Sequence, residues 1–431
     1  ATLDNDYQLS TGENFSFRTT LYMDVNLKWI KGLSVRADAS YGYGLAQSDY
    51  WLSGLIANTG NVDGNQGNKS KKTTKSQQYH AFAKYNREWT DHGLDIVTGI
   101  EANRSYTDNA VVAGKNLSGE FHEPKIIGTM LGNNSAYIGG ESYTFSFFNR
   151  IDYKFKQRYL LGASFVREGS SKFVKENRFG DFYSVSGGWI ISDEAFMESS
   201  NDWLSNLKLR IGYGVTGNSG GIGAYGTLTN AIIYSSSGIS IGGNNVPFAQ
   251  YTGTYSNPDL GWEKSHNWNI GVDFGLLSNR IDGSIEWFTT KTKGLLFKRT
   301  LPVTTGNTGW GRPLDIWENL AETSNMGVEA TINSHNIKTK DFSWDTTLSF
   351  TWSKEKINSL PTGDLIKENL FEGQPIHALY DYKYAGIWGS NVPQETLDAY
   401  GVKPGWVKIE TLDKDGDGGV QKYGEVDRQI L

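Results

Sequence analysis

The chain has 431 residues with a net charge of -6, and only 38% of them are hydrophobic although Gly reaches 51 and aromatics 13%. The absence of Cys excludes disulfides, zinc–thiolate sites and thiol nucleophiles. The one short basic cluster, Lys69 to Lys75, lies among Gly, Asn, Ser and Thr, so we expect a solvated loop there and no nucleic-acid partner. No apolar run approaches the roughly 18 residues of a transmembrane helix.

A two-residue alternation predicts about twelve β-strands, because only a strand places successive side chains on opposite faces. Between Phe342 and Ser353, for example, one parity is mostly bulky and apolar and the other is wholly polar. In chain order the predicted strands cover residues 21–29, 33–41, 78–88, 93–106, 143–155, 159–165, 182–192, 206–216, 265–276, 281–291, 324–335 and 341–353.

The connections between these strands alternate in length. Short turns are expected at Lys31-Gly32, Asp91-His92-Gly93, Lys156-Gln157-Arg158, Ser278-Asn279 and Lys338-Thr339-Lys340. Long polar connectors are expected at roughly residues 45–77 and up to about residue 142. Tight turns at one end and long loops at the other are typical of up-and-down outer-membrane barrels, whose strands need about ten residues to cross the bilayer. A soluble β-sandwich, propeller or β-helix is the alternative, and the lack of a fixed repeat of 40–50 residues disfavours a propeller.

Five segments carry a resemblance to a known family. They are Arg158 to Leu161 with Arg167 to Phe173, Phe182 to Ser192, Trp203 to Asn218, Asn257 to Glu263, and Asn325 to Glu329. In order and spacing they resemble the SusC/RagA family of TonB-dependent outer-membrane transporters of Bacteroidetes-type bacteria. One departure is Glu168, which stands where the family usually has Asp.

The resemblance implies an all-β, antiparallel, up-and-down transmembrane barrel in the outer membrane, surrounded by lipid. It implies 22 strands, an N-terminal plug opened by the TonB–ExbB–ExbD complex, a SusD-like lipoprotein lid, and an oligosaccharide or oligopeptide cargo. No plug sequence or TonB box is visible, so we interpret the chain as part of a longer protein, with about 12 or more strands of the full barrel. Residues 1–353 are expected to form strands with long extracellular loops, and residues 354–431 a further strand and a long extracellular loop with an Asp-rich turn.

The Asp-rich turn is Asp413-Lys414-Asp415-Gly416-Asp417-Gly418. Carboxylates at alternate positions can converge on one hard cation, so Asp413, Asp415 and Asp417 are candidate calcium ligands. The twelfth position of the loop is Gly424 and no helix signal flanks it, so an acidic turn without a metal is the alternative. No other cofactor is expected.

Aromatic residues expected in long connectors are the candidate cargo-binding residues, because flat rings suit sugar or peptide stacking. They are Tyr50, Trp51, Trp310, Trp317 and Trp388, and loop packing is the alternative role for each. Gly221 to Gly226 fits G-x-G-x-x-G, but no helix signal follows, so we interpret it as a flexible loop.

The sequence gives no positive signal for an enzyme. The six His are scattered without a metalloprotease spacing, and no G-x-S-x-G elbow occurs. We therefore expect an active importer, with a passive porin or a surface adhesin on the same barrel as the first alternative. A soluble carbohydrate-binding or hydrolytic β-protein is the second. The sequence leaves the choice between glycan and peptide cargo open.

Overall fold

The structure is a computed structural model. It describes residues 8–53, 65–117, 135–228, 231–241, 244–251, 254–302, 304, 308–309, 312–313, 315–361, 363–366, 369–410 and 428–430.

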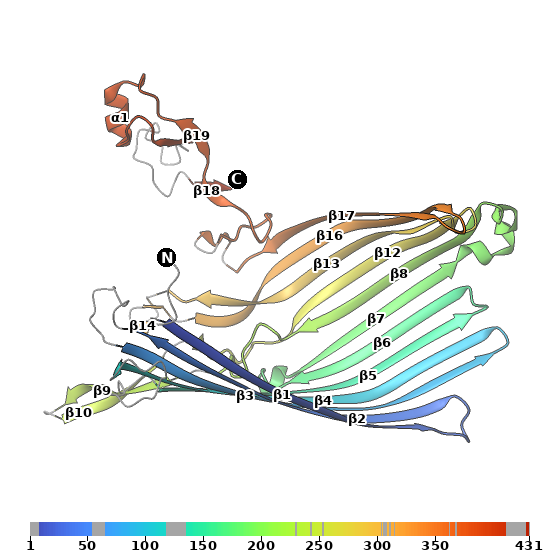
Figure 1. The fold of residues 1–431 in the computed structure, drawn as a ribbon, viewed down its shortest axis with the longest axis horizontal. Coiled ribbons are helices and arrows are strands. Elements are labelled where there is room, and N and C mark those ends of the chain that lie inside the picture. The colour runs from blue at the N-terminus through green and yellow to red at the C-terminus, as the bar shows by residue number, and fades with distance from the viewer. Residues whose placement is uncertain are drawn as a thin grey trace.

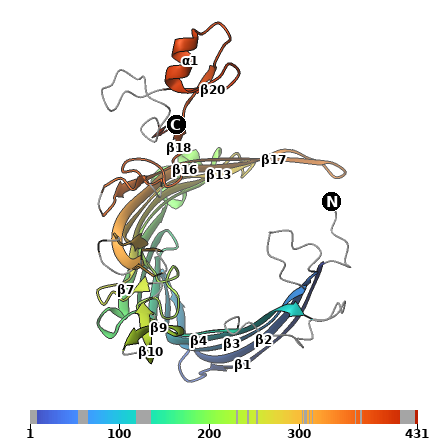
Figure 2. The ribbon, with the colours of Figure 1, turned by 90° about the vertical axis from the view of Figure 1, so that its left-hand side faces the viewer.

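One large sheet dominates these residues. Its long strands are β1 (Gln8–Asn26), β2 (Leu33–Leu52), β3 (Asn65–Trp89), β4 (His92–Leu117), β5 (Ser135–Phe155), β6 (Tyr159–Ser170), β7 (Phe179–Ile190), β8 (Leu204–Asn218), β12 (Glu263–Leu276), β13 (Ile281–Thr300), β16 (Asp315–Lys338) and β17 (Ser343–Ser359). Each of these strands pairs antiparallel with the long strand that follows it, and the two-residue β11 (Thr254–Tyr255) runs parallel to β16. The sheet curves into an open arc with β1 and β17 at its ends (Figures 1 and 2). The predicted up-and-down antiparallel sheet is therefore confirmed.

The two faces of the sheet differ in chemistry, and the strand register keeps them separate. Partners directly opposite one another in antiparallel strands share a face. On one face Ala39 lies between Leu21 and Tyr79; on the other, Asp38 lies between Tyr22 and His80. We call these the apolar face and the polar face. Large apolar residues of the apolar face are well exposed: Leu21 (74%), Met23 (62%), Leu161 (59%), Leu348 (65%) and Phe350 (61%).

Short turns close one end of the sheet, as the sequence predicts. Lys156 and Gln157 join β5 to β6 with φ of 50° and 56°, the left-handed pair that a tight hairpin turn needs. Leu277, Ser278 and Asn279 between β12 and β13 also have positive φ. Gly32 before β2 has a φ of 92°, and a Cβ there would overlap the carbonyl oxygen of Asn86, so only Gly fits. We call this the short-turn end.

At the opposite end, the expected long connectors are partly wrong. The stretch at residues 45–77 continues β2 to Leu52 and begins β3 at Asn65, so the Lys69 to Lys75 cluster lies in a strand. Likewise β4 continues to Leu117 and β5 begins at Ser135. The ladder continues because Ser and Thr pair across the strands, as in the 2.7 Å hydrogen bond between the Ser48 and Ser70 hydroxyls. We call this the long-loop end.

Smaller elements gather beyond the long-loop end or within connections. They are β9 (Ala231–Ile241), β10 (Asn244–Tyr251), β14 (Thr308–Gly309), β15 (Arg312–Pro313), β18 (Tyr380–Tyr382), β19 (Tyr384–Ile387), β20 (Val407–Ile409), β21 (Arg428–Ile430), α1 (Gln394–Tyr400), and the 3-10 helices η1 (Lys175–Asn177), η2 (Ile191–Asp193) and η3 (Ala195–Ser200). α1 stands off the sheet (Figure 1), and Gly401 ends it in the left-handed conformation with φ of 64°. The division of the chain at residue 353 stays a prediction.

Few apolar side chains are buried in the described residues, and three small clusters hold most of them. Phe173, Ile222 and Leu260 form one, Ala321, Ile357 and Leu360 a second, and Trp388, Leu397 and Val402 a third. All three lie at or beyond the long-loop end. The exposed Leu, Met and Phe residues of the apolar face are therefore left without a second protein layer over them in the described residues.

Candidate functional site

The polar face carries charged side chains that meet across neighbouring strands. His80 on β3 lies between two carboxylates, with its Nδ1 2.9 Å from Asp38 Oδ2 on β2 and its Nε2 3.5 Å from Glu101 Oε1 on β4. Arg36 adds a fourth member, with its Nε 3.6 Å from Asp38 Oδ1. Alternation places all four on one face, and the register brings them together although they are distant in sequence.

A second charged group centres on Arg210 of β8. Its Nε lies 3.0 Å from Asp273 Oδ1 on β12, and its Nη2 lies 2.9 Å from Glu286 Oε2 on β13. Asn269 also donates a hydrogen bond to Glu286. The side chains of Arg210, Asp273 and Glu286 are 32%, 28% and 24% exposed, so water still reaches them. Sequence analysis missed this group, and the signal that points to it is the set of opposite charges on the polar parity of three strands.

A hollow of about 540 Å³ adjoins this group near the short-turn end. Gly162, Gly188 and Gly212 contribute bare backbone to it, while Arg150, Lys208 and Arg210 supply positive charge. Gly212 faces open space, since a Cβ there would meet nothing within 4 Å. Exposed backbone and charges of both signs can bind polar ligands, and both amide and hydroxyl groups find partners there.

At the long-loop end, a packed rim joins connections that are far apart in sequence. The Phe173, Ile222 and Leu260 cluster packs against Trp317 of β16. Asn257 donates a 2.7 Å hydrogen bond to the carbonyl oxygen of Trp317. The rim therefore holds three connections at fixed positions relative to the sheet.

The structure describes four of the five predicted cargo-binding aromatics, and it does not bring them together. Tyr50 and Trp51 lie at the end of β2 and Trp317 lies in β16, so their expected placement in connectors is wrong, because both strands extend further than alternation indicates. Trp388 does lie in a connection, after β19. Trp310 lies outside the described residues.

Two of these rings are buried. Trp51 is 4% exposed, and Trp388 is 5% exposed against Leu397 and Val402, with Lys408 Nζ 5.0 Å from its ring centre. Contact of any of these aromatics with cargo stays a prediction.

The predicted calcium ligands Asp413, Asp415 and Asp417 also lie outside the described residues. Within the part of the chain that the structure describes, no group of three or more His, Asp or Glu side chains is arranged to hold a metal ion. The calcium site therefore stays a prediction.

Two carboxylates outside the strands have perturbed protonation. At the short-turn end, hydrogen bonds from Tyr159 and Trp189 and the charge of Arg158 hold the pKa of Glu194 below its usual range. The Trp189 Nε1 to Glu194 Oε1 distance is 3.0 Å. Near the C-terminus, Lys383 Nζ lies 2.7 Å from Glu410 and lowers its pKa in the same direction. Both contacts favour the ionised carboxylate.

None of the helices in the described residues is long and apolar enough to cross a membrane.

Comparison with known proteins identifies the family. The family model described as "TonB dependent receptor-like, beta-barrel" matches residues 1–425. TonB-dependent receptor P3 of Formosa agariphila is 28% identical over the whole chain, and TonB-dependent receptor SusC of Bacteroides thetaiotaomicron is 33% identical over 66% of it. These alignments cover 43% and 27% of the two relatives, so the chain spans less than half of their length.

Solved structures agree on the fold. The RagAB peptide importer in its 'open-open' state superposes with a TM-score of 0.79 at 21% identity, covering 99% of this chain and 44% of that one. In such barrels the apolar face meets lipid, the polar face lines the interior, and the short turns are periplasmic. The chain belongs to the TonB-dependent receptor β-barrel family, and its sheet is part of the wall of a transmembrane β-barrel in the outer membrane.

Proposed function

We propose that the full-length protein imports oligosaccharides or oligopeptides actively across the outer membrane. Energy would reach it through TonB, and a SusD-like lipoprotein would cover its extracellular mouth. Family membership supports import, and likeness to SusC supports the lipoprotein partner. The family comprises receptors and transporters rather than enzymes, which supports a role without catalysis.

The observation that carries this proposal is the continuous polar face opposite an exposed apolar face. An importer needs a water-filled interior, so that a polar cargo stays hydrated and does not enter the hydrocarbon layer. The two charged groups centred on His80 and Arg210 and the glycine-lined hollow supply such an interior wall. Donors and acceptors are both present, which suits sugars and peptides alike.

The aromatic residues Trp317, Trp388 and Trp310, with Tyr50 and Trp51, are proposed to contact cargo or lid at the extracellular mouth. Flat aromatic rings suit stacking against sugars or peptides. Alanine variants of Tyr50, Trp310 and Trp317, tested one at a time, should raise the cargo concentration needed for half-maximal uptake without lowering the amount of protein in the membrane. The rings of Trp51 and Trp388 are buried, so uptake by their alanine variants is compared at equal amounts of protein in the membrane. Unchanged uptake in every variant would contradict this role.

Asp413, Asp415 and Asp417 are proposed to bind calcium weakly on the extracellular side, where free calcium is abundant. Calorimetric titration of calcium into the full-length protein should lose its heat signal in Asp415→Asn. A heat signal that is the same in both proteins, or absent from both, would contradict the proposal.

Deleting the gene for TonB tests the energy source. Uptake of fluorescent oligosaccharides and oligopeptides by cells that depend on this protein should collapse, while the protein stays in the outer membrane. Unchanged uptake would favour a passive porin. Co-purification of the full-length protein with a surface lipoprotein tests the partner separately. The result for the partner and the result for the energy source can therefore be told apart.

A further inference from the structure

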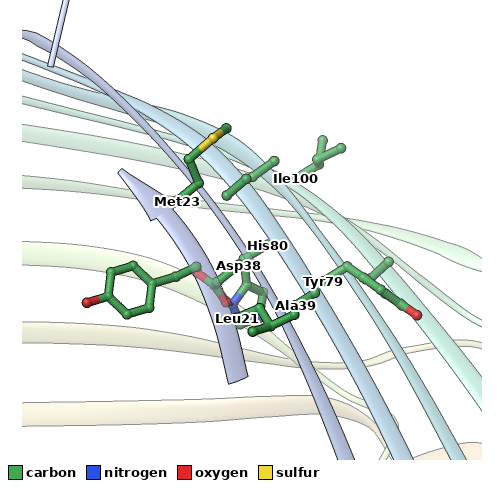
Figure 3. A pocket seen from close by; sticks show the side chains of 11 residues that line it. Leu21, Met23, Asp38, Ala39, Tyr79, His80 and Ile100 are labelled. Atoms are coloured by element: carbon green, nitrogen blue, oxygen red, sulfur yellow. The ribbon is translucent and has the colours of Figure 1, made fainter. Parts of the chain in front are cut away.

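The apolar face carries a groove floored by small residues. Across β1 to β4, one row of opposed residues reads Met23, Ala37, Ala81 and Ile100, and the next reads Leu21, Ala39, Tyr79 and Ala102. These eight residues, together with Tyr22, Asp38 and His80 of the polar parity, line a hollow of about 450 Å³ (Figure 3). The alanines are its smallest side chains, so they form a low floor between the larger Leu, Met, Tyr and Ile side chains. The shape is that of a trough in a surface that otherwise carries large apolar groups.

A second hollow of about 500 Å³ continues this trough toward the extracellular side. The two share Tyr79 and Ala102 as lining residues. Phe179 lies across Gly169 in the second hollow, since a Cβ at residue 169 would sit 2.6 Å from its ring. The trough is therefore longer than either hollow.

Two arginines line the second hollow. Arg104 is bound to Glu141 at 2.5 Å, and its guanidinium lies 5.5 Å from the Tyr143 ring centre. Arg178 is exposed, and no described residue forms an ion pair with it. Its backbone is fixed, because its carbonyl oxygen accepts hydrogen bonds from Ser170 N and from Trp262 Nε1. A positive charge is thus held at the extracellular end of an apolar trough.

The level of these arginines matches a membrane interface. Arg104 lies about 12 residues beyond the start of β4 at His92, which is ~40 Å along a strand and ~30 Å along the membrane normal at the usual tilt. That distance equals the thickness of the hydrocarbon layer. Exposed Tyr79, Tyr143 and Phe179 lie at the same level, where aromatic rings sit beside headgroups.

We propose that this trough binds one lipid of the outer leaflet whose phosphate headgroup carries a net negative charge. An acyl chain would lie over the alanine floor, and the phosphate would contact Arg178 and the outer edge of Arg104. The apolar trough complements the acyl chain, and the charge of Arg178, which has no ion-pair partner among the described residues, favours a net anionic headgroup over a zwitterionic one.

Native mass spectrometry of the full-length protein in detergent micelles tests the proposal. With dioleoyl phosphatidic acid as the probe, we expect one retained lipid, and much weaker retention of dioleoyl phosphatidylcholine. Ala81→Phe should abolish retention by filling the trough, and the milder Ala81→Leu should reduce it. Arg178→Gln should weaken apparent affinity roughly fivefold, as expected for one cation at a membrane surface. Heat-dependent gel mobility checks that each variant is folded.

Matched controls lie on the same face at the other end of the sheet. Ala330→Phe on β16 and Lys354→Gln on β17 make the same chemical changes away from the trough and should leave retention unchanged. Equal losses in these controls would overturn the proposal. So would equal retention of both lipids, displacement of the probe by inorganic phosphate alone, or unchanged retention in Ala81→Phe.

Discussion

Two adjacent residues of β8 offer a stringent comparison of the two faces. Ile211 lies on the apolar face, 45% exposed, opposite Gly187 and Ile270. Gly212 follows on the polar face, where an added Cβ would meet nothing within 4 Å. Arginine at residue 211 would place a charge against acyl chains, and arginine at residue 212 would place it in the water-filled interior.

The expected magnitude follows from depth. Ile211 lies about seven residues from the start of β8 at Leu204, which is ~24 Å along the strand and ~18 Å along the membrane normal, near the bilayer midplane. Arginine on the lipid face at this depth costs about 2–4 kcal/mol. Gly212→Arg should cost less than about 1 kcal/mol, because its guanidinium stays hydrated.

Guanidinium unfolding of the full-length protein in lipid vesicles, followed by tryptophan fluorescence, measures both costs. The midpoint should fall clearly for Ile211→Arg and shift little for Gly212→Arg. An equal or larger loss for Gly212→Arg would refute the assignment of the two faces.

Three further predictions concern single contacts. Arg210→Met should lower the free energy of unfolding by about 1–2 kcal/mol, since it removes two partly exposed ion pairs, and Asp273→Asn in the same chain should recover part of the loss in a double-mutant cycle. Glu194→Gln should destabilise the protein at pH ~7 and progressively less as the pH falls, because a carboxyl whose pKa is lowered by folding contributes stability that disappears as the pH falls through that pKa; thermal unfolding over a series of pH values checks this. Gly217→Ala would force a Cβ into the ring of Phe182, which is 6% exposed, and should cost about 1–3 kcal/mol by denaturant unfolding, whereas no measurable loss would contradict the packing.

Alternation predicted the membrane-crossing part of the sheet well, because one face there is uniformly apolar. The same pattern predicted the order of the strands and the tight turns such as Lys156-Gln157. Alternation did not predict the parts of β2 and β3 near the long-loop end, because both faces carry polar residues there. The composition of Lys69 to Lys75 is therefore like that of a loop, although its backbone pairs with β2.

Predicting the charged group around Arg210 requires the strand register as well as the alternation of polar and apolar residues. Arg210 is 63 residues from Asp273 and 76 from Glu286, and no local signal links them. The sequence did not predict the packed rim either, since Phe173, Ile222 and Leu260 come from three separate connections. The positions of Tyr50 and Trp51 depended on where β2 ends, which sequence reasoning places poorly.

Spin-label accessibility along β17 tests the opposite exposure of the two faces most directly. This chain has no Cys of its own, and any Cys elsewhere in the full-length protein would first be replaced by Ser. Single cysteines at residues 347 to 352 of the full-length protein in lipid vesicles would each carry a nitroxide. Labels replacing Leu348, Phe350 and Trp352 should collide mainly with oxygen dissolved in lipid, and labels at the three alternate positions mainly with a water-soluble nickel chelate. A uniform profile, or apolar positions shielded from both reagents as beneath a second protein layer, would contradict the account.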